Sequence, residues 1–97
     1  MITDIEYFIN ECVHDIDTSN GKRHENEDWN SALYTAKLVQ NKLQDIVRNK
    51  RFGELPPWHI LVRFHSRTFR FKGTNAVTEL REYVEVLMDV YVTEGLK

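Results

Sequence analysis

The chain has few of the residues that build specialised local chemistry. Its 97 residues include one cysteine, two prolines and four glycines. A single cysteine excludes an intramolecular disulfide, and the place of Cys12 on an apolar helical stripe predicts a buried side chain rather than a reactive thiol. The sequence has no run of about 18 apolar residues, so we expect no span of a bilayer. Asp4 and Glu6 stand where a secretory signal would need positive charge, and we therefore expect a cytoplasmic protein.

Recognisable catalytic and metal-binding patterns are also missing. None of the four histidines has a second histidine or a cysteine at metal-ligand spacing, and there is no glycine-rich phosphate loop. Glu82, Glu85 and Asp89 form an acidic stripe that could hold a divalent cation or transfer protons, but such stripes are more often the solvated face of an amphipathic helix. We predict a non-enzymatic protein without a cofactor or a metal ion.

The apolar residues predict three helices in a single domain over residues 1–97. A chain of this length with 41% hydrophobic content has room for one core. Apolar residues recur in alternating steps of three and four, which predicts helices over about 3–17, over about 28–50, and from the sequence GTN to Gly95. Residues 18–28 are polar and predict an exposed connection.

The expected helix ends follow from the residues beside them. Asn26 or Asp28 is expected to cap the second helix, because their side chains can accept hydrogen bonds from free backbone N–H groups. Gly53 is expected to end that helix, and Thr74 or Asn75 to cap the last one.

The stretch WHILVRFHSRTFRFKG, residues 58–73, predicts a β-hairpin. Apolar residues alternate from Trp58 to Phe64, and Phe69 and Phe71 share one face of a second strand. A two-residue turn at Ser66 and Arg67, or a four-residue loop in the same register, would pair Phe64 with Phe69. The predicted fold class is therefore α+β: three helices with a two-stranded antiparallel hairpin, in the order α-α-β-β-α.

The charge of the chain is strongly segregated, although its net value is only −2. Residues 1–30 hold eight acids and two bases, residues 31–72 hold nine bases and two acids, and residues 73–97 hold five acids and two bases. Such asymmetry is typical of a surface for an acidic partner, and equally of acidic helices that pack beside a basic segment.

The basic face of the predicted hairpin is the candidate binding surface. Arg63 would lie directly opposite Arg70, and like charges across a strand pair repel unless an anion lies between them. That anion could belong to the chain's own helices, to a protein partner or to nucleic acid. The candidate residues are Arg63, His65, Arg67, Arg70 and Lys72, with Arg48, Lys50 and Arg51 preceding them in the sequence.

These patterns predict a small binding protein that acts stoichiometrically on a macromolecule, with a protein inhibitor or regulator favoured. An inhibitor of a nuclease or CRISPR effector would be one instance, in which acidic helices occupy a groove meant for nucleic acid. The alternative is a nucleic-acid-binding module that uses the basic hairpin, against which stands a pI of about 6.1. The last helix is apolar over more than half its circumference, which also predicts a possible homo-oligomer. Trp29 and Trp58 are expected to be core residues first and interface anchors second.

Overall fold

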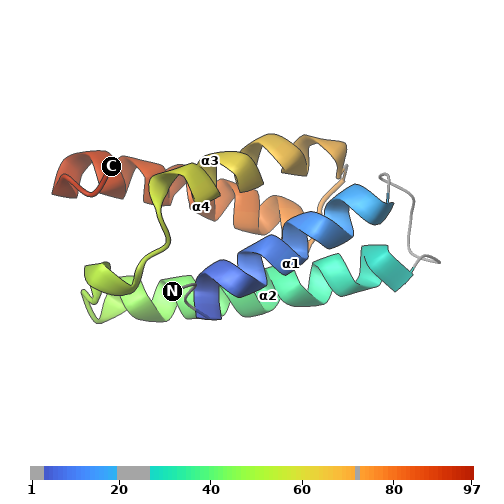
Figure 1. Cartoon of the computed structure of the whole chain (residues 1–97), viewed down its shortest axis with the longest axis horizontal. Helices are drawn as coiled ribbons and strands as arrows, with labels where there is room; N and C mark the ends of the chain where they lie inside the picture. Colours follow the sequence, from blue (N-terminus) through green and yellow to red (C-terminus); the bar gives the residue numbers. More distant parts are fainter. Residues whose placement is uncertain (1–3, 20–26, 72) are drawn as a thin grey trace.

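Four α-helices and two short 3-10 helices make up the described part of the chain, which contains no β-strand (Figure 1). The structure is a computed structural model that describes residues 4–19, 27–71 and 73–97, without the side chain of Arg70. The helices are α1 (Asp4–Ser19), α2 (Glu27–Arg48), η1 (Phe52–Glu54), α3 (Trp58–Arg67), η2 (Thr68–Arg70) and α4 (Ala76–Glu94). The predicted α+β class is therefore wrong, whereas the three predicted helices are confirmed as α1, α2 and α4.

The four α-helices form a ring of neighbours around one core. Helix α1 packs on α2 and α3, and α4 packs on the same two helices from the other side. Along the chain the helices alternate in direction, so α1 and α3 run one way while α2 and α4 run the other (Figure 1). The result is a molecule that measures 40 × 24 × 21 Å, with the α1–α2 pair and the α3–α4 pair on opposite sides of the ring.

In α1 and α2, the spacing of the apolar residues and the charges in the first turn both favour a helix. In both helices acids stand in the first turn, where they favour the positive end of the helix dipole. Both helices bury apolar residues at the expected steps of three and four, which are Ile5, Ile9, Cys12 and Ile16 in α1 and Trp29, Ala32, Ala36, Val39, Leu43 and Ile46 in α2. Helix α2 ends at Arg48, and Lys50, two residues later, has a φ of 54° in the left-handed region. Gly53, the expected end of this helix, instead lies within η1. Asp28 lies inside the first turn of α2, and Asn26 lies outside the described residues.

Helix α4 has the best-defined ends. The Asn75 side chain accepts hydrogen bonds from the backbone N–H groups of Val77 and Thr78, and the Thr78 hydroxyl accepts one from the backbone of Asn75. This reciprocal cap selects Asn75 over Thr74. Gly95 ends the helix with a φ of 70°, a conformation that glycine adopts without steric cost, which confirms the predicted boundary.

The segment predicted as a hairpin is instead helix α3 followed by η2. Two prolines do end the preceding segment, but Pro57 also serves as the N-cap of α3. Ile60, Leu61 and Phe64 are buried at helical spacing, whereas Val62 is 40% exposed. A helix is favoured over a strand in this segment because it buries the neighbours Ile60 and Leu61 together. In a strand, alternating side chains would expose one of the two to solvent.

The two phenylalanines of the expected second strand have opposite surroundings. Phe71 is only 1% exposed and stacks on the Trp29 ring with centroids 3.8 Å apart, whereas Phe69 is 60% exposed. The expected contact of Phe69 with Phe64 on one buried face is therefore wrong. Trp29, at the start of α2, is a core residue as expected.

The connection from α2 to α3 is held down by the last helix. The Tyr91 hydroxyl of α4 donates a hydrogen bond to the carbonyl oxygen of Pro56, and Trp58 lies beside the Tyr91 ring. This contact joins the connection between η1 and α3 to the C-terminal end of α4. The same connection precedes the segment that was expected to start the hairpin. Among the described residues, no helix combines the length and the apolar composition that crossing a membrane requires.

Candidate functional site

Three of the five basic candidates on residues 58–73 form hydrogen bonds with other side chains of the chain. Because this segment is helical, Arg63 and Arg67 face α1 while His65 faces α4. The contacts are Arg63 Nη2 to Asn10 Oδ1 at 2.8 Å, His65 Nε2 to Glu85 Oε1 at 2.9 Å, and Arg67 Nη1 to Asp17 Oδ2 at 3.1 Å. The side chain of Arg70 and the whole of Lys72 lie outside the described residues.

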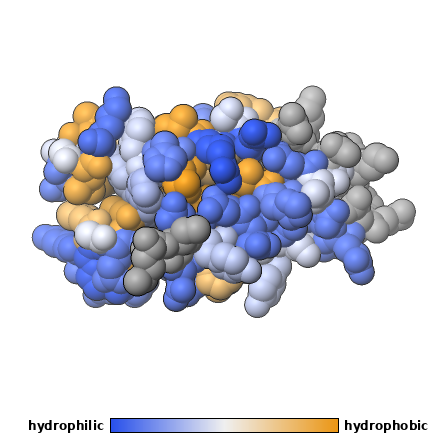
Figure 2. Space-filling model, viewed as in Figure 1, coloured by the Kyte–Doolittle hydropathy of each residue, from blue (hydrophilic) through white to orange (hydrophobic). Residues whose placement is uncertain are grey.

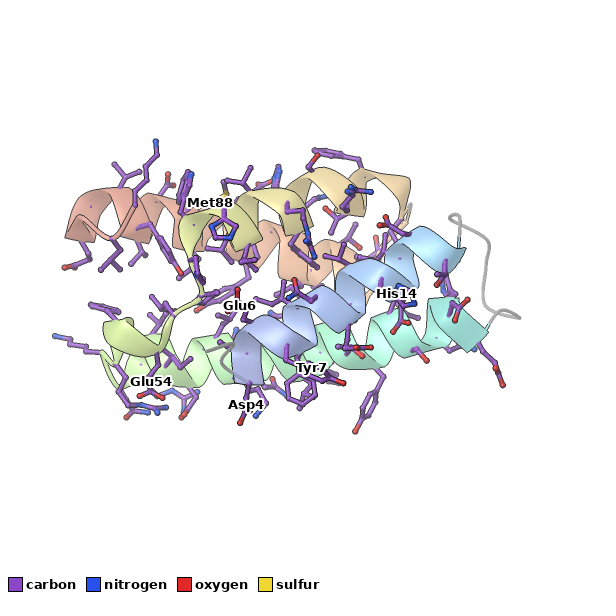
Figure 3. The ribbon with its side chains drawn as sticks, in the orientation of Figure 1. Asp4, Glu6, Tyr7, His14, Glu54 and Met88 are labelled. Atoms are coloured by element: carbon purple, nitrogen blue, oxygen red, sulfur yellow. The ribbon has the colours of Figure 1, made fainter. Side chains whose placement is uncertain are left out.

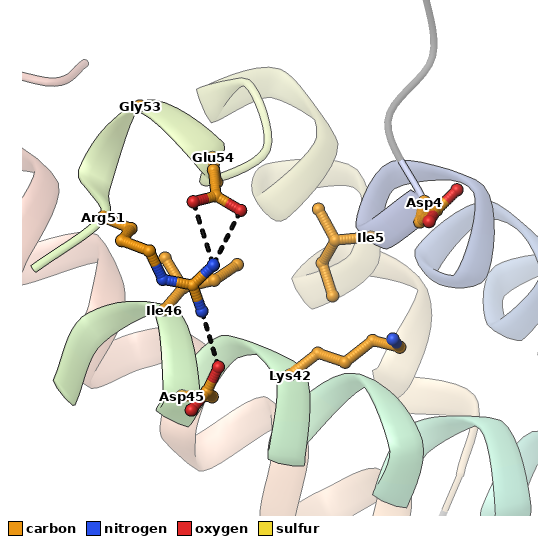
Figure 4. Close-up of a pocket in the computed structure, with 8 residues that line it drawn as sticks. All are labelled: Asp4, Ile5, Lys42, Asp45, Ile46, Arg51, Gly53 and Glu54. Atoms are coloured by element: carbon orange, nitrogen blue, oxygen red, sulfur yellow. Dashed lines mark hydrogen bonds and ion pairs between the residues drawn. The ribbon is translucent and has the colours of Figure 1, made fainter. Parts of the chain in front are cut away.

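The other three basic candidates lie at the C-terminal end of α2, at the opposite end of the long axis from Arg67 (Figure 1). Figure 4 shows Arg51 bridging two carboxylates: its guanidinium lies 2.5 Å from Asp45 and 2.9 Å from Glu54. Arg48 and Lys50 are exposed and make no ion pair with a described residue. The structure therefore separates the candidates into two groups and brings no continuous basic surface together among the residues it describes.

A cavity of about 410 Å³ lies beside this arginine, between the start of α1, the end of α2 and η1 (Figure 4). Its lining mixes Arg51 and Lys42 with acids that include Asp4 and Glu54. The lining holds three acids and two bases, and Arg51 is already paired with two of the carboxylates, so little charge of one sign is left to select a ligand.

A second hollow, of about 480 Å³, lies between α1 and α2, and its charged lining residues are all acids. We call it the acidic tyrosine groove and define it by Tyr7, Glu11 and Asp15 of α1 with Ser31 and Tyr34 of α2. The three α1 residues are four positions apart, which places them on one face of the helix. Figure 3 shows Tyr7 on the side of α1 that faces α2.

The aromatic rings of the acidic tyrosine groove are unusually open to solvent. Tyr7 is 53% exposed and Tyr34 is 74% exposed, although both are large side chains. Tyr7 meets the Phe8 ring edge to face at 5.6 Å, which holds it at the groove wall. Exposed tyrosines of this kind offer contact area together with a hydrogen-bonding group, a combination enriched at binding surfaces.

The carboxylates of the groove repel one another. The pKa of Asp15 is raised by partial burial, and further by the negative charges of Asp28 and Glu11, while His14 opposes the shift. Burial first, and the neighbouring negative charges second, disfavour the ionised form of Asp15, so a cation that approaches would stabilise that form. The arrangement therefore favours a positively charged ligand that can also lie against tyrosine rings.

The acidic tyrosine groove was missed in the sequence analysis. The four-residue spacing from Tyr7 to Asp15 was available as a signal. How close Tyr34 and Asp28 of α2 come to these α1 residues depends on how the two helices pack. The spacing of residues along the sequence does not show this packing.

Other groups among the described residues also have a raised pKa because they are buried. Burial, with a smaller contribution from Asp15, raises the pKa of Cys12 to about 12, and its thiol donates to the Ala32 carbonyl oxygen at 3.6 Å. Burial also raises the pKa of Tyr91. The prediction that Cys12 is a buried side chain is confirmed. Within residues 4–19, 27–71 and 73–97, no group of three or more His, Cys, Asp or Glu side chains could hold a metal ion.

Comparison of the chain with protein-family models, with curated proteins and with solved structures found no match.

Proposed function

We propose that this chain is a small non-enzymatic protein that binds a protein partner stoichiometrically, as an inhibitor or regulator, and that the acidic tyrosine groove receives an arginine-bearing segment of that partner. The observation that carries the proposal is the pairing of repelling carboxylates, Glu11 and Asp15, with two open tyrosine rings in one groove. An arginine side chain satisfies both features, because its guanidinium pairs with carboxylates and stacks on aromatic faces.

A partner that uses basic surface to bind nucleic acid fits this groove by charge. A nuclease or a CRISPR effector is one such class, and occupation of its basic surface by α1 and α2 would compete with nucleic acid. The direct nucleic-acid-binding alternative has less support, since Arg67 is paired with Asp17 and Arg51 with two carboxylates.

The proposal is tested with a fluorescently labelled arginine-rich peptide and a matched peptide in which glutamine replaces arginine. We expect the arginine peptide to bind and the glutamine peptide not to bind in fluorescence anisotropy. Tyr34→Ala should weaken binding by about 2- to 30-fold, the range of one cation–π contact of about 0.5–2 kcal/mol. Glu11→Gln should also weaken it, because one carboxylate of the groove is lost.

The matched control is Glu82→Gln, which removes the same charge from an exposed position on α4. Equal losses for Glu11→Gln and Glu82→Gln would show that net charge alone attracts the peptide, and the groove would be rejected. Labelled duplex DNA and single-stranded RNA form the second arm of the experiment. Tight binding of either, with a steep loss as salt rises and a further loss in Arg63→Glu, would overturn the proposal in favour of nucleic acid.

A further inference from the structure

The solvent side of the α3–α4 pair forms an ordered seam. His65 of α3 meets Glu85, Phe69 of η2 meets Arg81 at 5.1 Å, and at the start of α3 Trp58 lies beside Tyr91. Each step of about one turn along α3 and η2 therefore corresponds to one turn in the opposite direction along α4, as expected for antiparallel helices.

Apolar side chains are exposed along this seam at several levels. Phe69 is 60% exposed, Val92 is 62% exposed and Val62 is 40% exposed, while Trp58 and Met88 are partly covered. We call these five residues the apolar seam. Figure 2 shows separate orange patches over α3 and the C-terminal part of α4, with blue and pale surface between them. Exposed apolar side chains grouped along one side of a helix pair are typical of an interaction site.

The two edges of the apolar seam carry opposite charge. On α4 the exposed acids Glu82 and Asp89 lie along the outer edge, and neither makes an ion pair with a described residue. On α3 the exposed side chains of His59 and Arg63 lie along the other edge. Arg63 keeps its charge available, because its partner is the neutral amide of Asn10.

A surface with one basic edge and one acidic edge is complementary to a copy of itself in one orientation. A two-fold axis parallel to the apolar seam places α3 of one protomer over α4 of its partner, so that each basic edge meets an acidic edge. The contact ladder places His59 and Arg63 on either side of the level of Asp89. A two-fold axis across the seam would instead bring edges of like charge together.

We propose that the apolar seam is the interface of a symmetric homodimer whose two-fold axis runs parallel to α3 and α4, with a second copy of this chain as the occupant. The seam lies on the opposite side of the helix ring from the acidic tyrosine groove. Dimerisation therefore leaves the groove open, and this inference is independent of the proposed function.

Sedimentation equilibrium over a range of protein concentrations tests the dimer. We expect the wild-type protein to show a monomer–dimer equilibrium. Val92→Glu should raise the dissociation constant by more than about tenfold. Because the dimer is symmetric, the substitution adds one buried charge from each protomer to the interface. Tyr34→Glu, a charge added at an exposed position in the groove, is the matched control and should leave the equilibrium unchanged. A wild-type protein that stays monomeric at every concentration would overturn the proposal.

A charge exchange tests the orientation. Arg63→Asp and Asp89→Arg should each weaken the dimer by about tenfold, since each places like charges across the interface. The double variant, Arg63→Asp with Asp89→Arg, should recover the wild-type constant within about threefold, because the exchanged pair attracts again. A double variant as weak as the sum of its single changes would rule out the parallel two-fold arrangement. Circular dichroism of each variant confirms that the helices are retained.

Discussion

Replacement of Phe71 by alanine separates the observed helical fold from a hairpin. The Phe71 ring is 1% exposed and lies 3.8 Å from the Trp29 ring at an interplanar angle of 9°. Deletion of a buried phenylalanine side chain costs about 3–5 kcal/mol, because apolar contacts are lost and a cavity remains. We expect Phe71→Ala to lower the free energy of unfolding by about 4 kcal/mol, which corresponds to a fall in Tm of roughly 15–30 °C for a domain of this size.

Phe69→Ala provides the matched control two residues away. Phe69 is 60% exposed and contacts Arg81 and His65 at the surface. Its removal should cost less than about 1 kcal/mol, as surface changes usually do. A hairpin with Phe69 and Phe71 on the same buried face would instead give similar losses for both.

Urea denaturation followed by far-UV circular dichroism measures both variants. Equal losses at the two positions would refute the assignment of this segment to α3 and η2. If Phe71→Ala does not fold, Phe71→Leu and Phe69→Leu carry the same comparison. The buried position should then lose about 1–2 kcal/mol, because leucine retains most of the apolar volume.

Four further predictions concern single residues. Asn75→Ala should lower the free energy of unfolding by about 1 kcal/mol in the same assay, because two backbone N–H groups of α4 lose their acceptor; no loss would contradict the capping role. Lys50→Gly should raise the free energy of unfolding by about 0.5 kcal/mol, because glycine adopts the left-handed conformation without strain. A lower free energy of unfolding would show that the φ of 54° causes no strain at Lys50. Cys12, with its pKa raised to about 12, should react with a thiol-specific reagent in denaturant but not in native buffer at neutral pH. Since the pKa of Asp15 is raised above 3.8 on folding, the folded state binds its proton more tightly, and stability should fall as the pH rises from that value through the folded pKa. Asp15→Asn should remove this decline and stabilise the protein at neutral pH, and unfolding curves that keep the same pH dependence would contradict this.

Long segments with regular apolar spacing were predictable from the sequence. Helices α1, α2 and α4 lie close to their expected ranges, because each has at least five apolar residues on one stripe and polar residues at its ends. The short segment from Trp58 was not predictable in this way. Its apolar residues fit a period of two and a helical period, and only burial against α1 and α4 decides between them. The adjacent pair Ile60 and Leu61, both buried, is the local sign that favoured the helix.

The candidate sites were harder to predict, because they depend on pairs of helices. A row of arginines in the sequence suggested a free basic surface, but α3 turns Arg63 and Arg67 toward polar groups of α1. The acidic tyrosine groove and the apolar seam each combine residues from two helices. Their side chains come together only when the packing of those helices is known.

The placement of the two tryptophans gives the molecule an internal optical reporter at each end of its long axis. Trp29, stacked on Phe71, lies where α2 begins, and Trp58 lies where α3 begins, 4.9 Å from the Lys97 ammonium group. Each indole emits from a different environment, since one is covered by a phenyl ring and the other borders water and a cation. A chain that retains a single tryptophan would therefore report whether one end of the bundle opens before the other, without an attached dye.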